Sequence, residues 1–211
     1  MKAFTKALIL LILAASLLAA GCGRGKDPAS LSTPAPENTG ASPTDLPEYM
    51  QTPDPALYEL GDDGYFEDEI LCANWPSFLE YIGHVLSNNA QYRGYLPNGK
   101  KLLFSYLTDD GASYSDEIAG HDKSSYQKFM REQINEYFEL YEFEYTTVDG
   151  HQALRVLYDY APPDDEAKRV HVLQYLINVR GWVMTLTFTT QDEFPEVCDD
   201  CIKTIRFKDG Y

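Results

Sequence analysis

The chain has 211 residues and carries 33 acidic against 17 basic side chains, which gives a formal net charge of −16 at pH 7. A chain this acidic repels nucleic-acid phosphates and anionic lipid headgroups, so its charge argues against a nucleic-acid partner and against a helix lying on the membrane surface. The same charge permits a cationic partner or a metal ion without demonstrating either.

The first residues have the order of an export signal. Lys2 and Lys6 precede an uncharged run over residues 7–20, which is too short for a bilayer span of roughly 20 apolar residues. A basic start followed by an apolar run and small residues is typical of a cleaved signal peptide. We therefore expect residues 1–21 to be removed, which leaves 15 basic residues against 33 acidic ones and a formal charge of −18.

The apolar run ends in a cysteine. The stretch Leu18-Ala19-Ala20-Gly21-Cys22 resembles the lipobox of bacterial lipoproteins, although that family usually carries Leu, Val or Ile at the place of Ala19. The resemblance implies a diacylglyceryl group on the Cys22 thiol, and two acyl chains anchor a protein stably. We expect an extracytoplasmic protein anchored to the cell membrane through Cys22. A plain signal peptide with an incidental cysteine is the alternative.

The composition changes after this cysteine. Residues 22–63 mix seven prolines with Ser, Thr, Ala, Gly and Asn, and large apolar residues are sparse. Such a segment buries too little surface to offset its ordering entropy, so we expect a flexible linker with an r.m.s. reach on the order of 35 Å. Residues 64–211 then form a single domain of common size.

The domain opens with an apolar pattern at helical spacing. Phe78, Ile82 and Val85 recur at intervals of three and four residues. Proline suits the first turn of a helix, so Trp75-Pro76 marks the expected start. The pattern predicts a helix that ends near residue 89.

A hairpin, a loop and a second helix follow. Asn98-Gly99 is the strongest kind of short turn signal and joins expected strands at 92–96 and 101–107. Residues 109–122 are polar and predict a loop, whereas an apolar stripe predicts a helix over 124–139. Two residues at the start of this helix fit a capping box: Ser124 and Gln127.

The remaining pattern predicts an antiparallel sheet. Its elements, in chain order, are strands 142–148 and 151–160 about the turn Asp149-Gly150, a loop at 161–166, strands 170–179 and 182–189 about Arg180-Gly181, a short helix over 191–201 with Asp192 as N-cap, and a strand over 203–208. Because hairpins imply antiparallel pairing, and because the helices stand beside hairpins, we predict an α+β fold with helices packed on an antiparallel β-sheet.

Two stretches resemble the PsbP/Mog1-like fold and its bacterial lipoprotein relatives. They are Asp149-Gly150-His151-Gln152-Ala153-Leu154-Arg155-Val156 and Gly181-Trp182-Val183-Met184-Thr185-Leu186-Thr187-Phe188, the second followed by Phe194 and residues 202–207. The resemblance covers residues 124–207, whereas Trp75-Pro76 departs from the strand that usually opens the fold. It implies the fold and diverse binding or assembly roles, and it supplies no site.

Cys198 and Cys201 form a Cys-x-x-Cys pair, which can be redox active at a helix N-terminus. Apolar neighbours at helical intervals turn both thiols toward the core, and Asp199 and Asp200 disfavour a thiolate. Core packing or a structural disulfide is therefore favoured over redox or metal chemistry. Cys72 can pair with either thiol in an oxidising compartment, so the pairing stays open.

No motif in the sequence identifies a chemical reaction. The acidic loop at 109–122 lacks the spacing of an EF-hand, and no nucleophile elbow or zinc-protease motif is present. The four histidines belong to no such motif: His84, His121, His151 and His171. We expect no enzyme activity, no cofactor and no metal site.

Sixteen tyrosines suggest a binding surface, because Tyr and Trp carry much of the energy at interfaces. Tyr158 and Tyr160 share one face of an expected strand, and Tyr175 lies on the next strand. If exposed, these rings form a candidate site for a peptide, a glycan or a protein. The simpler interpretation is that tyrosine suits half-buried sheet faces.

The sequence thus favours a non-catalytic binding or assembly module, anchored outside the membrane, with an unidentified protein or cell-wall partner. A receptor for a small solute or glycan is the alternative, and an enzyme of unrecognised type is the third hypothesis. A deep pocket with converging polar groups would favour a receptor or an enzyme, whereas a flat aromatic patch would favour a protein partner.

Overall fold

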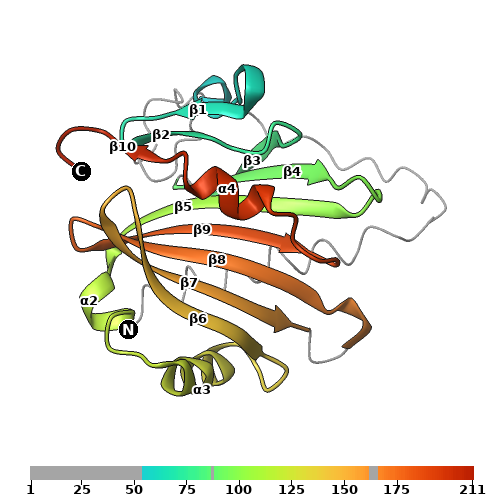
Figure 1. The fold of residues 1–211 in the computed structure, drawn as a ribbon, viewed down its shortest axis with the longest axis vertical. Helices are drawn as coiled ribbons and strands as arrows, with labels where there is room; N and C mark the ends of the chain where they lie inside the picture. Colours follow the sequence, from blue (N-terminus) through green and yellow to red (C-terminus); the bar gives the residue numbers. More distant parts are fainter. Residues whose placement is uncertain (1–53, 87, 162–165) are drawn as a thin grey trace, which may run out of the picture.

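The computed structural model describes residues 54–86, 88–161 and 166–211, which form two antiparallel sheets and three short α-helices (Figure 1). The expected signal peptide, Cys22 and most of the expected linker lie outside these residues. Within the described ranges, no helix combines the length and the apolar character that a membrane crossing requires.

The larger sheet has seven strands, and every neighbouring pair is antiparallel. In spatial order the strands are β3 (Glu80–Leu86), β4 (Asn89–Tyr95), β5 (Lys101–Ser113), β9 (Trp182–Thr190), β8 (Val170–Val179), β7 (His151–Tyr160) and β6 (Glu139–Val148). The strand order therefore joins two meanders, β3-β4-β5 and β6-β7-β8-β9, through the central pair β5 and β9.

The smaller sheet has three strands, in the order β1 (Tyr65–Glu67), β2 (Leu71–Asn74) and β10 (Arg206–Phe207). The helices are α2 (Tyr114–Glu117), α3 (Lys123–Gln133) and α4 (Val197–Ile202), with 3-10 turns η3 (Pro55–Leu57), η4 (Asp62–Gly64) and η5 (Glu166–Lys168). In Figure 1 the small sheet lies beside β3 and β4, and α4 crosses in front of β5 and β9.

The two faces of the large sheet carry separate apolar clusters. The first cluster joins the small sheet and α4 to one face, and it centres on the rings of Trp75, Phe104 and Phe188. The second cluster lies on the other face with α2 and α3, and it contains Tyr126 and Met130 of α3. Alternate residues of a strand point to opposite faces of the sheet. Because both faces are covered by apolar clusters, the sequences of the central strands are nearly continuous apolar runs.

Several predicted elements are confirmed. The fold class is a large antiparallel sheet with few helices, and all three predicted hairpin turns join neighbouring strands. Asp149 and Gly150 have φ of 47° and 84°, and Arg180 and Gly181 have φ of 54° and 97°. Two successive positive φ values characterise the two-residue turn that matches strand twist.

The helix predicted from Trp75-Pro76 to residue 89 is wrong, because residues 80–86 of this segment form the edge strand β3. The pairing of β3 with β4 shifts register twice, between Tyr81 and Gly83 and again near His84. Each shift inserts a residue and breaks the two-residue alternation of a strand. Apolar side chains therefore fall at helical intervals although the backbone is extended.

Other boundaries also differ from the prediction. The expected loop at 109–122 begins as an extension of β5 to Ser113 and continues as α2. Helix α3 is shorter than 124–139, and its capping box consists of Asp122 and Ser125 instead of Ser124 and Gln127. Asp192 caps no helix, since α4 begins after Glu196, which makes no side-chain cap bond. The last strand contains two residues of the predicted six.

Candidate functional site

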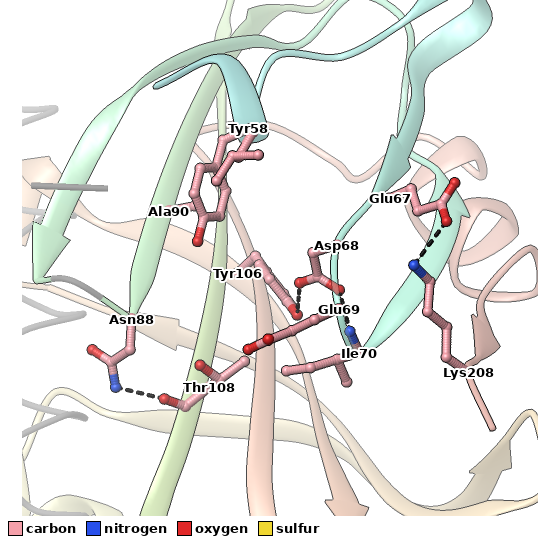
Figure 2. Close-up of a pocket in the computed structure, with 11 residues that line it drawn as sticks. Tyr58, Glu67, Asp68, Glu69, Ile70, Asn88, Ala90, Tyr106, Thr108 and Lys208 are labelled. Atoms are coloured by element: carbon pink, nitrogen blue, oxygen red, sulfur yellow. Dashed lines mark hydrogen bonds and ion pairs between the residues drawn. The ribbon is translucent and has the colours of Figure 1, made fainter. Parts of the chain in front are cut away.

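A cavity of about 1000 Å³ opens between the β1–β2 turn and the strands β4 and β5 (Figure 2). Its lining residues come from five separate stretches of the chain. They are Leu57 and Tyr58, the turn residues Glu67 to Ile70, Asn88 and Ala90, Tyr106 and Thr108, and Lys208. The cavity therefore exists only when the small sheet has docked beside the large one.

The carboxylate of Asp68 is held in one orientation by the turn that carries it. Oδ1 accepts the backbone N–H of Ile70 at 2.8 Å and that of Leu71 at 2.9 Å. Oδ2 accepts the hydroxyl of Tyr106 at 2.6 Å, across from β5. Aspartate suits such turns because its short side chain reaches backbone N–H groups further along the chain. The site thus has a negative charge whose position does not depend on a ligand.

An aromatic group packs behind one wall of the cavity. The ring of Tyr58 stacks on Tyr81 with centroids 5.9 Å apart, and it meets the ring of His84 edge-on at 4.3 Å. The Tyr81 hydroxyl bonds to His84 Nδ1, whereas His84 Nε2 is buried and has no hydrogen-bond partner among the described residues. Because Tyr58 is fixed between these rings, its phenol presents a rigid surface to the cavity.

The opposite wall is polar. Asn88 Nδ2 donates to the carbonyl of Thr108, and the Thr108 N–H donates to the carbonyl of Asn88 at 3.0 Å. Figure 2 shows the side chain of Glu69 extending from the β1–β2 turn toward Thr108. Among the residues that the structure describes, Glu69 has neither a hydrogen-bond donor nor an ion-pair partner for its exposed carboxylate.

The electrostatics of the cavity are set by burial and by these acids. Burial first, and then the charge of Asp68, raises the pKa of Tyr58 and raises that of Tyr106 far above its ordinary value. Both phenols therefore stay protonated at neutral pH. Burial also lowers the pKa of His84, so its imidazole is neutral there.

Among the residues that the structure describes, one basic side chain lines the cavity, and it is already paired. Lys208 Nζ lies 2.7 Å from Glu67 Oε1 at the rim. The lining therefore keeps two carboxylates, those of Asp68 and Glu69, without a basic partner. Across the described part of the chain, no group of three or more His, Cys, Asp or Glu side chains is arranged to hold a metal ion.

The tyrosines chosen from the sequence lie elsewhere and form no exposed row. Tyr158 and Tyr160 are 3% and 8% exposed within the second cluster, where the ring of Tyr158 packs on Phe138. Tyr175 is buried on the opposite face, with its hydroxyl 2.6 Å from Asp199 Oδ1. The simpler interpretation, that these rings pack on the sheet, describes their positions.

The cysteines are free thiols in the described residues, and Cys198 and Cys201 are buried in the first cluster as expected. The Cys201 thiol donates to the carbonyl of Cys198 at 3.2 Å. Cys72 is half-buried on β2. None of the three lines the cavity.

Sequence reasoning missed the residues that form the site. The run Glu67-Asp68-Glu69 is visible in the sequence, but it follows the expected linker closely and matches no site motif, so it predicts no role by itself. Tyr106 lies on the strand predicted at 101–107, but no sequence pattern pairs it with a turn 38 residues away. The useful signal is an acidic tripeptide between two short apolar runs, which suits a turn better than a linker.

No protein-family model matches the chain, and no match was found among curated proteins. Solved structures with similar folds include cyanobacterial PsbP (CyanoP) from Synechocystis, which is 17% identical, with a TM-score of 0.46 over 81% of this chain and 99% of that one. A Pseudomonas aeruginosa protein of unknown function, described as a putative regulator, is 20% identical, with a TM-score of 0.39 over 48% of this chain and 67% of that one. A Bacteroides thetaiotaomicron structure is 10% identical, with a TM-score of 0.39 over 66% of this chain and 46% of that one. These likenesses concern the fold, and they lend no function or site to this chain.

Proposed function

We propose that the chain is an extracytoplasmic lipoprotein, anchored through Cys22, whose folded domain is a non-catalytic binding module. The lipobox resemblance and the basic and apolar residues before Cys22 support the anchor. The linker that follows separates the domain from the membrane. The domain then presents its ligand site to the space outside the cell membrane.

The cavity beside Asp68 is the observation that carries the binding role. Its volume of about 1000 Å³ stands at the upper end of the range for small-molecule sites, and its walls combine apolar, aromatic and a few fixed polar groups. The polar atoms of Asp68 and Tyr106 are held by bonds within the protein, which lowers the cost of ordering them when a ligand binds.

The same cavity favours a small ligand over a flat protein surface. Among the exposed large apolar side chains of the described residues, one lines this cavity, and it is that of Leu57. A hollow with converging polar groups is the arrangement that distinguishes a receptor from an assembly surface. The high pKa of Tyr106 makes its hydroxyl a hydrogen-bond donor and a poor nucleophile at neutral pH.

Photo-crosslinking from the rim of the cavity tests this proposal. Leu57 is 64% exposed and lines the cavity, so a photoreactive residue there should form an adduct of small-molecule mass in living cells. Tyr95 is 55% exposed and lies outside the lining, so the same residue there serves as the matched control. Equal adducts at both positions, or none at Leu57, would count against the cavity as a binding site.

A further inference from the structure

The described lining of the cavity carries more negative than positive charge. Glu67, Asp68 and Glu69 supply three carboxylates from one turn, whereas Lys208 is the one basic side chain that the described residues contribute to the lining. Lys208 is bonded to Glu67 at 2.7 Å, so its charge is already matched. Two adjacent carboxylates therefore face a partly enclosed space without a cation.

Hydrogen bonds orient one of these charges without neutralising it. The three donors to Asp68 are two backbone N–H groups and the phenol of Tyr106, all of them uncharged. Uncharged donors stabilise a carboxylate but leave its full charge available to a ligand. Glu69 beside it has no donor among the described residues, so its side chain is free to meet a bound cation.

The negative charges of the cavity also act on the phenol of Tyr58. Burial is the main reason why the pKa of Tyr58 is raised, and the charges of Asp68 and Glu69 contribute in the same direction. The two smaller contributions show that both carboxylates lie near the phenol of Tyr58, whereas burial alone would raise its pKa without any charge. An aromatic side chain beside two carboxylates is the combination that binds ammonium groups, because the ring attracts the charge and also covers its carbon substituents.

We propose that this cavity binds a small organic ammonium ion, with Glu69 and Asp68 facing the charge and Tyr58 covering its carbon groups. The proposal rests on the binding role proposed above and names the ligand class. A metal ion fits less well, because it needs several oxygen ligands in direct contact, whereas the oxygens of Asp68 already accept three protein donors and Glu67 is held by Lys208. The volume is also far larger than one ion needs.

Calorimetric titration of the full chain in detergent tests the proposal with n-butylammonium chloride as the probe. We expect binding that weakens as salt is added, since screening reduces the attraction between the carboxylates and the ligand. Sodium butyrate, which has the same chain length and the opposite charge, should not bind. Calcium binding at the same site in place of butylammonium would overturn the assignment.

Two substitutions locate the binding. Glu69→Gln removes a free carboxylate at nearly constant shape and should weaken butylammonium binding by about tenfold or more. Tyr58→Leu should weaken it by a similar factor through the lost ring. Glu193→Gln removes an exposed charge outside the lining and should leave the affinity unchanged.

The outcomes separate this inference from the proposed function. If the wild-type protein binds no butylammonium while Leu57 still captures a small-molecule adduct, the cationic ligand class is wrong and the binding role stands. If Glu69→Gln binds butylammonium as tightly as Glu193→Gln and the wild type do, the ammonium ion binds elsewhere and the inference fails. Thermal unfolding of each variant should show that the fold is retained, and Glu69, which bonds to no described residue, is the safest position for this purpose.

Discussion

Two thiols show how burial decides the chemistry of a residue. The pKa of Cys198 is raised to about 12, first by burial and then by the charge of Asp199, and burial also raises that of Cys201. A thiol needs its thiolate form to act as a nucleophile. The Cys-x-x-Cys spacing alone is therefore insufficient to indicate a redox function in this chain.

We predict that Cys198 and Cys201 resist alkylation in the folded protein at pH 8, because nearly all of each thiol is protonated and shielded from solvent. Treatment with iodoacetamide followed by mass spectrometry should find both unmodified, with the half-buried Cys72 reacting first. After unfolding in guanidinium all three should react. Rapid modification of Cys198 in the folded state would contradict the burial described above.

Gly64 is a second residue whose role is set by its surroundings. Its φ is +80°, and a Cβ at this position would collide with the carbonyl oxygen of Trp75. The Trp75 N–H donates to the Gly64 carbonyl at 2.9 Å, so the two backbones meet closely where the small sheet begins.

Gly64→Ala should lower the free energy of unfolding by roughly 2–4 kcal/mol, from the strained φ and from the collision with backbone. Gly99→Ala is the matched control, because Gly99 has the same φ of +80° and open space around it. The control should cost only about 1 kcal/mol. Urea unfolding of both variants measures the difference, and equal losses would show that the close approach to Trp75 is unimportant.

At the scale of elements, a charged group fastens α4 to the large sheet. Arg155 of β7 donates through Nε and Nη2 to the two oxygens of Asp199, each at 3.0 Å, and the Tyr175 hydroxyl donates to Oδ1 at 2.6 Å. Burial alone would raise the pKa of Asp199, but the bonds from Arg155 and Tyr175 outweigh it and lower the pKa.

Because the pKa of folded Asp199 is lowered, its contribution is complete above the ordinary value of 3.8 and is lost as pH falls through the folded value. Asp199→Asn should reduce stability at pH 7 by about 1–2 kcal/mol, a figure discounted because the side chain is 37% exposed. The loss should shrink below about pH 4. Chemical unfolding at a series of pH values measures it.

The neighbouring residue provides the control for this prediction. Asp200 pairs with Lys203 one helical turn away, and both side chains are more than half exposed. Asp200→Asn should therefore change stability by less than about 0.5 kcal/mol at any of these pH values. A loss equal to that of Asp199→Asn would assign the effect to the charge of the helix and not to the contact with Arg155.

Elements with a local signal were predictable, and elements defined by distant contacts were not. The turns at Asn98-Gly99, Asp149-Gly150 and Arg180-Gly181 specify positive φ through their own residues, so the sequence places these hairpins correctly. The bulges of β3 depend on pairing with β4 and imitate a helical pattern. The cavity was beyond prediction for the same reason, since its walls meet only through tertiary packing.

The edge strands of the large sheet are protected by different devices. The bulges of β3 disturb the spacing of its free backbone groups, and β6 carries Glu142 and Glu144 as exposed charges. Both devices hinder the pairing of an edge with another molecule. The large sheet can therefore keep two open edges without pairing with a second molecule.

At the scale of the whole molecule, the proposed lipid anchor would determine where the cavity meets a ligand. Cys22→Ala removes the thiol that the lipobox resemblance marks for acylation, so the variant should leave the membrane fraction and appear in the soluble fraction. Fractionation followed by immunoblotting and mass determination checks this. Unchanged membrane association together with unchanged mass would refute the anchor.

The short strand β10 has a consequence for the order of assembly. It completes the small sheet by pairing with β2, and Asn74 of β2 bonds to Thr204 across 130 residues of chain. If the chain is exported from its amino end, as proposed above, one edge of β2 stays unpaired until the residues near Phe207 have crossed the membrane. The cavity, whose wall this sheet supports, would then be among the last features to form, so a chain interrupted before β10 would carry the proposed lipid anchor without the proposed binding site.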